Sequence, residues 1–193
     1  MLTITEIISK NLAERRRFWQ NLQPDAGLST FVERLIQVLE NQGKLLIIGN
    51  GGSSSQASHL AAELVNRFYI DRPAIAALAL TTDTANLTSI ANDSDYRFVF
   101  SRQIQAVGRP GDMLLALTTG GTSPNIIEAI RTVKRCGIHC SVLCGNKTET
   151  LQAEKPDLLI PVDSSNTPTI QETHLFYIHL IAEAIELWAR NQA

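Results

Sequence analysis

The α/β character of this chain is clearest in one segment, Lys44-Leu45-Leu46-Ile47-Ile48-Gly49-Asn50-Gly51-Gly52-Ser53-Ser54-Ser55. The first half of the segment is a short, continuous apolar run, which is typical of a strand buried on both faces of a parallel sheet. The second half is rich in glycine and serine, and a helical pattern follows over residues 54–67. We therefore expect a buried strand that runs through a tight loop into a helix.

The same alternation continues to the end of the chain. Further apolar runs of this kind lie at residues 74–80, 113–117, 140–144 and 158–162, bounded by Gly, Asp, Asn or Pro. Helical patterns are found at residues 85–91, 98–107, 123–136, 149–154 and 170–189. Alternating strands and helices predict right-handed crossovers and a doubly wound, five-stranded parallel sheet. Ligands of such sheets bind outside the carboxyl ends of the strands, so the loops there are the candidate site.

The first forty residues have only helical periodicity. Apolar residues recur at helical spacing before and after the break at Pro24-Asp25-Ala26-Gly27, which predicts two helices. We expect residues 1–193 to form a single domain, with a helical N-terminal arm at 1–42 and an α/β sandwich at 43–193. The apolar stripes of the arm need a partner, either the sandwich or another copy of the chain.

Composition limits the functional classes. The 193 residues include 17 basic and 19 acidic side chains, a formal net charge of −2. This balance argues against nucleic-acid binding, which favours a basic surface. No apolar run approaches the ~18–20 residues of a membrane span, and the N-terminus lacks the pattern of a signal peptide. Three cysteines without such a signal favour the reducing cytoplasm.

Two loops have the composition of a phosphate site. The first loop (residues 50–55) follows the first strand, and the second loop (residues 118–123) follows the run at 113–117 and precedes Pro124. Glycines allow the backbone to approach a ligand, and hydroxyls at a helix start share N–H groups with an anion. Neither loop is a Walker A or a Gly-x-Gly-x-x-Gly motif. A small phosphoester is therefore favoured over a nucleotide.

These loops, together with Ala91-Asn92-Asp93, resemble those of the sugar isomerase (SIS) fold and, within it, of the phosphoheptose isomerase family. The resemblance implies a flavodoxin-like sheet and binding of a sugar phosphate. The substrate-binding positions that it implies are Asn50, Gly51, Gly52, Ser53, Asn92, Asp93, Thr118, Thr119, Gly120, Ser123 and Gln171. The second loop reads Thr-Thr-Gly-Gly-Thr-Ser where Ser-Thr-Ser-Gly-Asn-Ser is usual in the family, so Gly120 offers an amide but no hydroxyl.

An acid–base pair is expected from two helices. His59 and Glu63 are four residues apart and share one helix face, while His179 lies on the last helix. Aldose–ketose isomerisation needs a base to move a proton between C1 and C2 and an acid for the carbonyl oxygen. The resemblance implies that Glu63 is the base and His179 the acid, acting through an enediol. It further implies conversion of sedoheptulose 7-phosphate to D-glycero-D-manno-heptose 7-phosphate for bacterial surface heptose.

The resemblance also implies zinc, one ion per subunit, at positions occupied here by His59, Glu63, Gln171 and His179. Imidazole nitrogens and a carboxylate suit Zn²⁺, but a ligated Glu63 cannot act freely as a base. Gln171 and His179 are eight residues apart, ~12 Å along a helix. They reach one ion only if their side chains lean together, if the helix begins after Gln171, or across a subunit boundary.

Several alternatives remain open at this point. A single helical histidine is usually structural, and His174 lies roughly 140° around the helix from His179, which favours an interface or supporting role. Cys136, Cys140 and Cys144 are expected to be core residues. The resemblance implies homotetramers with active sites between subunits. The competing functions are a SIS-fold binding protein associated with the replication initiator and an isomerase of another sugar phosphate.

Overall fold

The computed structural model describes residues 3–23 and 26–191, and within them five strands form one parallel sheet. The strands are β1 (Leu45–Gly49), β2 (Ala77–Ala79), β3 (Met113–Leu117), β4 (His139–Cys144) and β5 (Leu158–Pro161). Their order is β2-β1-β3-β4-β5, with every neighbouring pair parallel. This is the flavodoxin-like order of a doubly wound sheet, as predicted from the sequence.

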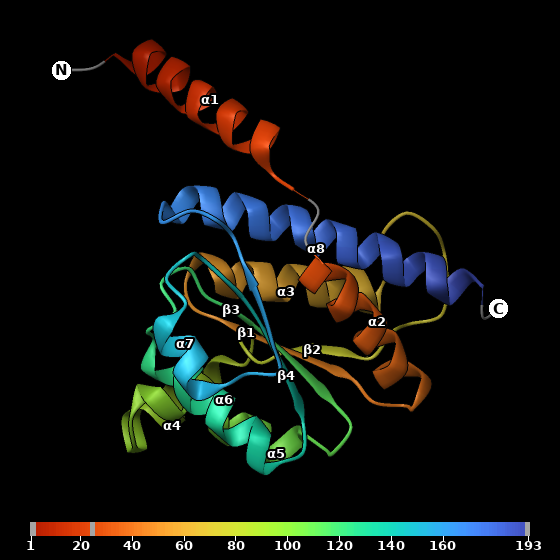
Figure 1. Ribbon diagram of the computed structural model, residues 1–193. Coiled ribbons are helices and arrows are strands. Elements are labelled where there is room, and N and C mark those ends of the chain that lie inside the picture. The colour runs from red at the N-terminus through yellow and green to blue at the C-terminus, as the bar shows by residue number, and fades with distance from the viewer. Residues whose placement is uncertain (1–2, 24–25, 192–193) are drawn as a thin grey trace.

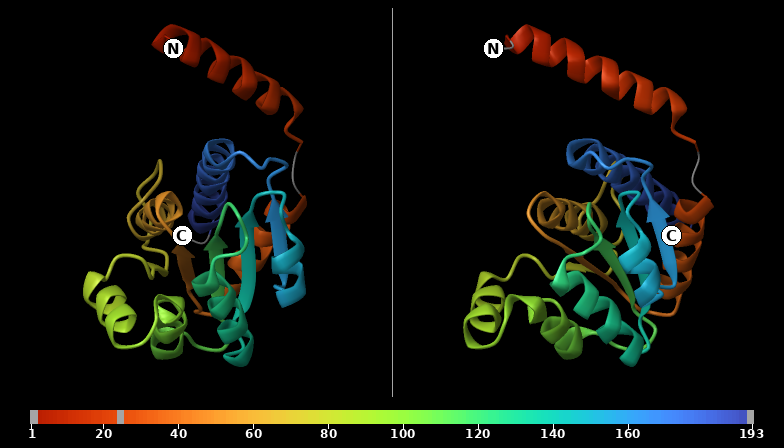
Figure 2. Two further views of the ribbon diagram at one scale, coloured as in Figure 1. Left: turned by 90° about the vertical axis from the view of Figure 1, so that its left-hand side faces the viewer. Right: turned by 60° about the vertical axis from the view of Figure 1, so that its left-hand side comes forward.

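Helices cover both faces of the sheet (Figures 1 and 2). The α-helices of the described residues are α1 (Ile4–Asn21), α2 (Ala26–Glu40), α3 (Gly52–Val65), α4 (Thr84–Asp93), α5 (Ser101–Val107), α6 (Pro124–Arg135), α7 (Glu149–Glu154) and α8 (Thr167–Arg190). A short 3₁₀ helix, η1 (Tyr96–Phe98), precedes α5. One face carries α2, α3 and α8, and the other carries α4, α5, α6 and α7 (Figure 2).

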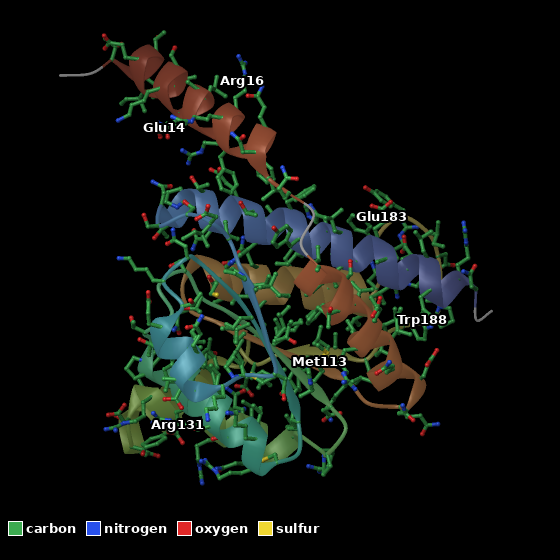
Figure 3. All side chains as sticks on the ribbon, in the orientation of Figure 1. Glu14, Arg16, Met113, Arg131, Glu183 and Trp188 are labelled. Atoms are coloured by element: carbon green, nitrogen blue, oxygen red, sulfur yellow. The ribbon has the colours of Figure 1, made fainter. Side chains whose placement is uncertain are left out.

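The two layers of helices explain why the strand sequences are continuously apolar. Leu45 and Ile47 face the cluster formed with α2, α3 and α8, whereas Leu46 and Ile48 face the cluster on the other side. Because every side chain of β1 is buried, no polar position interrupts the run. Met113, labelled in Figure 3, begins the neighbouring strand in the interior of the molecule. The second strand is shorter than expected, since as an edge strand β2 pairs with β1 over only three residues.

Polar side chains cap the starts of α1, α4 and α8. Thr3 and Glu6 form a reciprocal capping box at the start of α1. Asp83 accepts from Asn86 N at the start of α4, and Asn166 accepts from Thr169 N at the start of α8. Helix α8 (Thr167–Arg190) therefore begins before Gln171.

The expected N-terminal arm divides into two unlike parts. In α2, Phe31, Leu35 and Val38 are buried in the core against α8 and the sheet, so α2 belongs to the layered body. No residue of α1 is buried, and Figures 1 and 2 show α1 standing away from that body. The arm is therefore α1 alone, rather than residues 1–42. Of the expected break, Pro24 and Asp25 lie outside the described residues.

Among the described residues, α1 contacts α8 through a salt bridge and through a pair of aromatic rings. The guanidinium of Arg15 donates to the Glu172 carboxylate, with Nε 2.9 Å from Oε2. The Trp19 and Phe176 rings meet edge to face, with centroids 5.3 Å apart. No helix in the described part of the chain is long and apolar enough to cross a bilayer.

Candidate functional site

The two predicted loops lie at the carboxyl ends of adjacent strands. The first loop leaves β1 and starts α3 on one face of the sheet, while the second loop leaves β3 and starts α6 on the other face. The chain thus departs in opposite directions from two neighbouring strands. This is the topological switch point at which ligands of open α/β sheets bind.

The conformation of the second loop depends on Gly121. Its φ is +70°, and a Cβ there would lie 2.9 Å from the carbonyl oxygen of Lys147. Its amide donates to the hydroxyl of the buried Thr118, at 3.2 Å. The neighbouring Gly120 has open space around its Cβ position. Ser123 precedes α6 without capping it through its hydroxyl, which leaves that group free to contact an anion at the helix start.

A pair of amide side chains links the two loops. Asn50 Nδ2 donates to Asn125 Oδ1 at 2.9 Å, and Asn125 Nδ2 donates to Asn50 Oδ1 at 2.8 Å. The hydroxyl of Tyr96 also donates to Asn50 Oδ1, at 3.3 Å. Asn125 and Tyr96 were not among the predicted site residues. The sequence signal that could have identified Asn125 is its amide side chain at the start of the helix after the second loop. This residue is buried in the structure.

Gln171 lies against the first loop. Its Nε2 is 2.6 Å from the position that a Cβ of Gly52 would occupy, so a side chain at Gly52 would require the Gln171 side chain to shift. The backbone carbonyl of Gln171 accepts from Gln56 Nε2 at 2.7 Å. Two of the predicted substrate-binding positions, from opposite ends of the sequence, are thus neighbours at the start of α3.

Asn92 and Asp93 end α4 and are exposed. Their side chains bond to each other, with Asn92 Nδ2 2.8 Å from Asp93 Oδ1. Asp93 also lines a hollow together with Arg102 and Glu128. The hydrogen bond that connects this side of the molecule to the first loop comes from Tyr96, in η1, rather than from either of the two predicted residues.

The predicted acid–base residues meet at one imidazole. His59 Nε2 lies 3.1 Å from His179 Nε2 and 3.5 Å from Glu63 Oε1. We call His59, Glu63 and His179 the imidazole–carboxylate cluster. Helices α3 and α8 pack side by side, and they run in the same direction because Gly52 lies next to Gln171 and His59 next to His179. Phe68, just beyond α3, stacks on His179 with ring centroids 5.7 Å apart.

The cluster lies further along this helix pair than the first loop. Glu63 follows Gly52 by eleven residues on α3, a rise of ~16 Å. Within one chain, Glu63 is therefore well separated along α3 from Gly52 of the first loop.

The four predicted zinc ligands are not all brought together. Gln171 and His179 both lie within the continuous helix α8, ~12 Å apart, so the helix does not begin between them. Across the described residues, no group of three or more His, Cys, Asp or Glu side chains is arranged to hold a metal ion. The two facing imidazoles still suit zinc, since nitrogens bound tetrahedrally at ~2.05 Å lie about 3.3 Å apart.

The remaining histidine of α8, His174, is fully buried, so it is not an exposed interface residue. Apart from the backbone of Cys144, its ring nitrogens have no hydrogen-bond partner within the described chain. Burial lowers the pKa of His174 to about 4, opposed only in part by the Cys144 carbonyl. Burial likewise raises the pKa of the Cys140 and Cys144 thiols to about 12, as expected for unreactive core cysteines.

Comparison with known proteins gives consistent matches. The sequence profile of the SIS domain matches residues 13–145. A phosphoheptose isomerase of Aromatoleum aromaticum is 47% identical over 163 residues, covering 83% of this chain and 82% of the relative. One of Burkholderia pseudomallei is 42% identical over 183 residues, covering 93% of this chain and 92% of the relative.

The fold agrees with that of a solved relative. The structure of a phosphoheptose isomerase from Neisseria gonorrhoeae has a TM-score of 0.87 at 36% identity, covering 95% of this chain and 99% of that one. Together with the sequence matches over most of both chains, this similarity identifies the family. The chain belongs to the phosphoheptose isomerase family of SIS-domain proteins.

Proposed function

We propose that this protein is an aldose–ketose isomerase that converts sedoheptulose 7-phosphate to D-glycero-D-manno-heptose 7-phosphate, a step toward bacterial surface heptose. Relatives named phosphoheptose isomerase support this proposal. The observation that carries it is the contact of Glu63 and His179 with one imidazole, that of His59. A binding protein on this fold does not need a carboxylate and two imidazoles in one cluster.

The reaction requires two proton transfers at neighbouring carbons. The Glu63 carboxylate removes a proton from C1 of the ketose while His179 donates a proton to the carbonyl oxygen on C2, which gives the enediol. Return of the proton to C2 and loss of the O1 proton then give the aldose. A carboxylate and an imidazole at one site are suited to these two roles.

The phosphate is assigned to the second loop. Thr118, Thr119, Gly120 and Ser123 surround the start of α6, where amides and hydroxyls favour an anion. The first loop, with Asn50, Gly51, Gly52 and Ser53, and the residues Gln171, Asn92 and Asp93 are assigned to the sugar. The adjacency of Gln171 to Gly52 supports this grouping.

The site is proposed to lie between subunits of a homotetramer. A seven-carbon chain with its phosphate extends about 10 Å, at ~1.5 Å for each single bond. This is less than the ~16 Å that separates the first loop from Glu63 along α3. If one subunit supplies the cluster and another supplies the loops, a substrate of this length can contact the cluster and the loops at the same time. Exposed Ile4, Ile8 and Leu12, which form a stripe on α1, offer an apolar surface for assembly.

One zinc ion per subunit is proposed at the imidazole–carboxylate cluster. His59, Glu63 and His179 would supply nitrogen and oxygen donors of the kind that zinc prefers, and while it is a ligand Glu63 could not act freely as the base. Gln171 joins them only from another subunit, given its distance along α8. When bound, zinc would supply Lewis-acid polarisation of the substrate carbonyl. The His179 ring also lies against Phe68, which restricts its orientation.

We further propose that residues 1–193 form a single SIS domain and that the protein acts in the cytoplasm on a sugar phosphate, without nucleotide or nucleic acid. The three cysteines, all free and two of them buried, suit a reducing compartment.

An NMR assay of C5, C6 and C7 ketose phosphates, with and without a chelator, tests the proposal. We expect conversion of sedoheptulose 7-phosphate to D-glycero-D-manno-heptose 7-phosphate, and little conversion of the shorter sugars. Preferred turnover of a C5 or C6 substrate would instead assign another sugar phosphate. Binding of all three without turnover would favour a binding protein. Loss of activity with chelator would support the zinc site.

A further inference from the structure

A buried ion pair lies next to the imidazole–carboxylate cluster. The side chains of Arg72, in the segment after α3, and Glu186, on α8, are 1% and 4% exposed, and Arg72 Nε lies 3.6 Å from Glu186 Oε1. Burial of two charges is costly unless both are paired and hydrogen-bonded. The groups that hydrogen-bond to Arg72 and Glu186 therefore show which segments the ion pair holds in place.

Glu186 holds the backbone of the segment that carries Phe68. Its two carboxylate oxygens accept from Phe68 N at 2.8 Å and from Tyr69 N at 2.7 Å. Burial opposes ionisation of this carboxyl, but the backbone amides of Tyr69, Phe68 and Ile70, together with Arg72, lower the pKa of Glu186 below its ordinary value. The carboxylate is thus a fixed anchor for residues 68–70.

Arg72 holds the end of α3. Its Nη2 donates to the carbonyl oxygen of Glu63 at 2.7 Å, and its Nη1 donates to that of Leu64 at 2.8 Å. The last carbonyls of a helix have no partner within the helix, so an external donor fixes the position of the terminal turn. In this protein, that turn carries Glu63.

The anchored segment places Phe68 over His179. The two rings are nearly parallel, with an angle of 26° and centroids 5.7 Å apart. Tyr69 also packs against Phe68, with ring centroids 4.1 Å apart. His179 is therefore in contact with an aromatic ring from the anchored segment as well as with His59.

We propose that the buried Glu186–Arg72 pair is a positioning device for the isomerase reaction, because it holds Phe68 against the His179 ring and the end of α3 that carries Glu63. The inference rests on the proposed function, because that function makes Glu63 and His179 the proton-transfer groups. Both of them lie near the Glu186–Arg72 pair. Glu186, Arg72 and Phe68 touch no reacting atom in this account. They act through His179 and Glu63.

Asp112 provides a matched control. It is a buried carboxylate that accepts from two backbone amides, those of Lys44 and Arg109, and pairs with the Lys44 ammonium. It therefore has the same kinds of partners as Glu186. It directly precedes β3, at the end of the sheet opposite the two loops, so its loss affects stability without touching the cluster.

The kinetic test compares Glu186→Gln with Asp112→Asn, each assayed as the full-length assembled protein well below its melting temperature. We expect kcat to fall roughly 10-fold to 100-fold in Glu186→Gln with KM within about twofold, because misplaced reacting groups slow the chemical step. In Asp112→Asn we expect kcat to stay within about twofold of that of the wild type. An equal fall of kcat in both variants, or a change confined to KM, would overturn the proposal.

A spectroscopic test separates this proposal from the proposed function. With ¹³C-labelled histidine, the His179 resonance is assigned by its loss in His179→Gln, and in the wild type we expect it to be shifted by the Phe68 ring current. It should move in Glu186→Gln and in Phe68→Leu, which leaves the ion pair intact, but not in Asp112→Asn. An unmoved resonance in Phe68→Leu overturns the positioning role. Absence of turnover by the wild type contradicts the proposed function and leaves this measurement valid.

Discussion

His59 Nε2 and His179 Nε2 lie 3.1 Å apart, although the two residues are 120 positions apart in the chain. A neutral imidazole has one donor and one acceptor nitrogen, so a hydrogen bond between two Nε2 atoms requires opposite tautomers on the two rings. The tautomers of His59 and His179 are thus linked. Glu63, 3.5 Å from His59 Nε2, is the nearby carboxylate. The proposed base and acid are therefore coupled through a third residue.

The first prediction concerns Glu63 as the base. Replacement by glutamine, in Glu63→Gln, keeps the size of the side chain but removes the proton acceptor. We expect kcat to fall about 10²-fold to 10⁴-fold, with binding of the sugar phosphate nearly unchanged. Steady-state kinetics and calorimetric titration with substrate measure the two effects. Glu183→Gln, at an exposed position of α8 that is labelled in Figure 3, is the control. Unchanged turnover in Glu63→Gln would remove the proposed base.

The second prediction concerns zinc at the cluster. Elemental analysis of the purified protein should find one zinc per subunit, and His59→Gln and His179→Gln should each lose it, because both imidazoles face one position. His139→Gln, at the start of β4, should retain zinc. Loss of zinc in Gln171→Ala would show that a second subunit supplies a ligand, since Gln171 is ~12 Å from His179 along α8. Full zinc content in both histidine variants would refute this site.

The third prediction uses the two adjacent glycines of the second loop. At Gly120 a Cβ meets open space, so Gly120→Ser should fold normally and lower KM by adding a hydroxyl near the phosphate. At Gly121, with φ of +70° and the Lys147 carbonyl 2.9 Å from the Cβ position, Gly121→Ser should strain the loop by about 1–2 kcal/mol. We expect its KM to rise several-fold. Kinetics and thermal melting compare the two variants, and equal behaviour would argue against the loop as the phosphate site.

The fourth prediction is a pH dependence of stability. The pKa of His174 is about 4 in the folded chain because of burial, against ~6.5 when unfolded. Below pH 6.5 the unfolded chain binds a proton that the folded chain does not. The contribution to stability is thus complete above pH 6.5 and is lost as the pH falls toward 4, by about 3 kcal/mol in total.

Urea unfolding of the wild type and of His174→Gln at several pH values measures this contribution. The difference in stability between the two proteins should decrease at acid pH, since glutamine does not titrate and the contributions of other groups cancel. A difference that is constant from pH 7.5 to pH 5 would show that His174 is accessible to protons in the folded state.

The fifth prediction concerns assembly through α1. Ile4→Asp, Ile8→Asp and Leu12→Asp combined place charge along the exposed apolar stripe. By sedimentation, we expect the wild type to be a tetramer and the triple variant to be a smaller species. Thr5→Asp, Ser9→Asp and Ala13→Asp add the same charge along an adjacent row of α1 and should preserve the tetramer. A monomeric wild type would contradict the proposed intersubunit site.

Much of the fold followed from local sequence. Strands buried on both faces carry uninterrupted apolar runs, so β1 and β3 were recognisable within a few residues. The two loops were recognisable because glycine and hydroxyl residues between a strand and a helix have a local conformational role. The bounds of the edge strand β2 were less predictable, since they depend on its single neighbour.

The sequence by itself determined the parallel α/β fold and the two loops, because backbone conformation, periodicity and helix-start chemistry are local properties. The tertiary structure alone decided that α2 joins the core, that Gln171 lies against Gly52, and that Asn125 links the loops. It also decided the pairing of Arg72 with Glu186. These contacts join residues distant in the chain, and they depend on the direction and register in which helices pack.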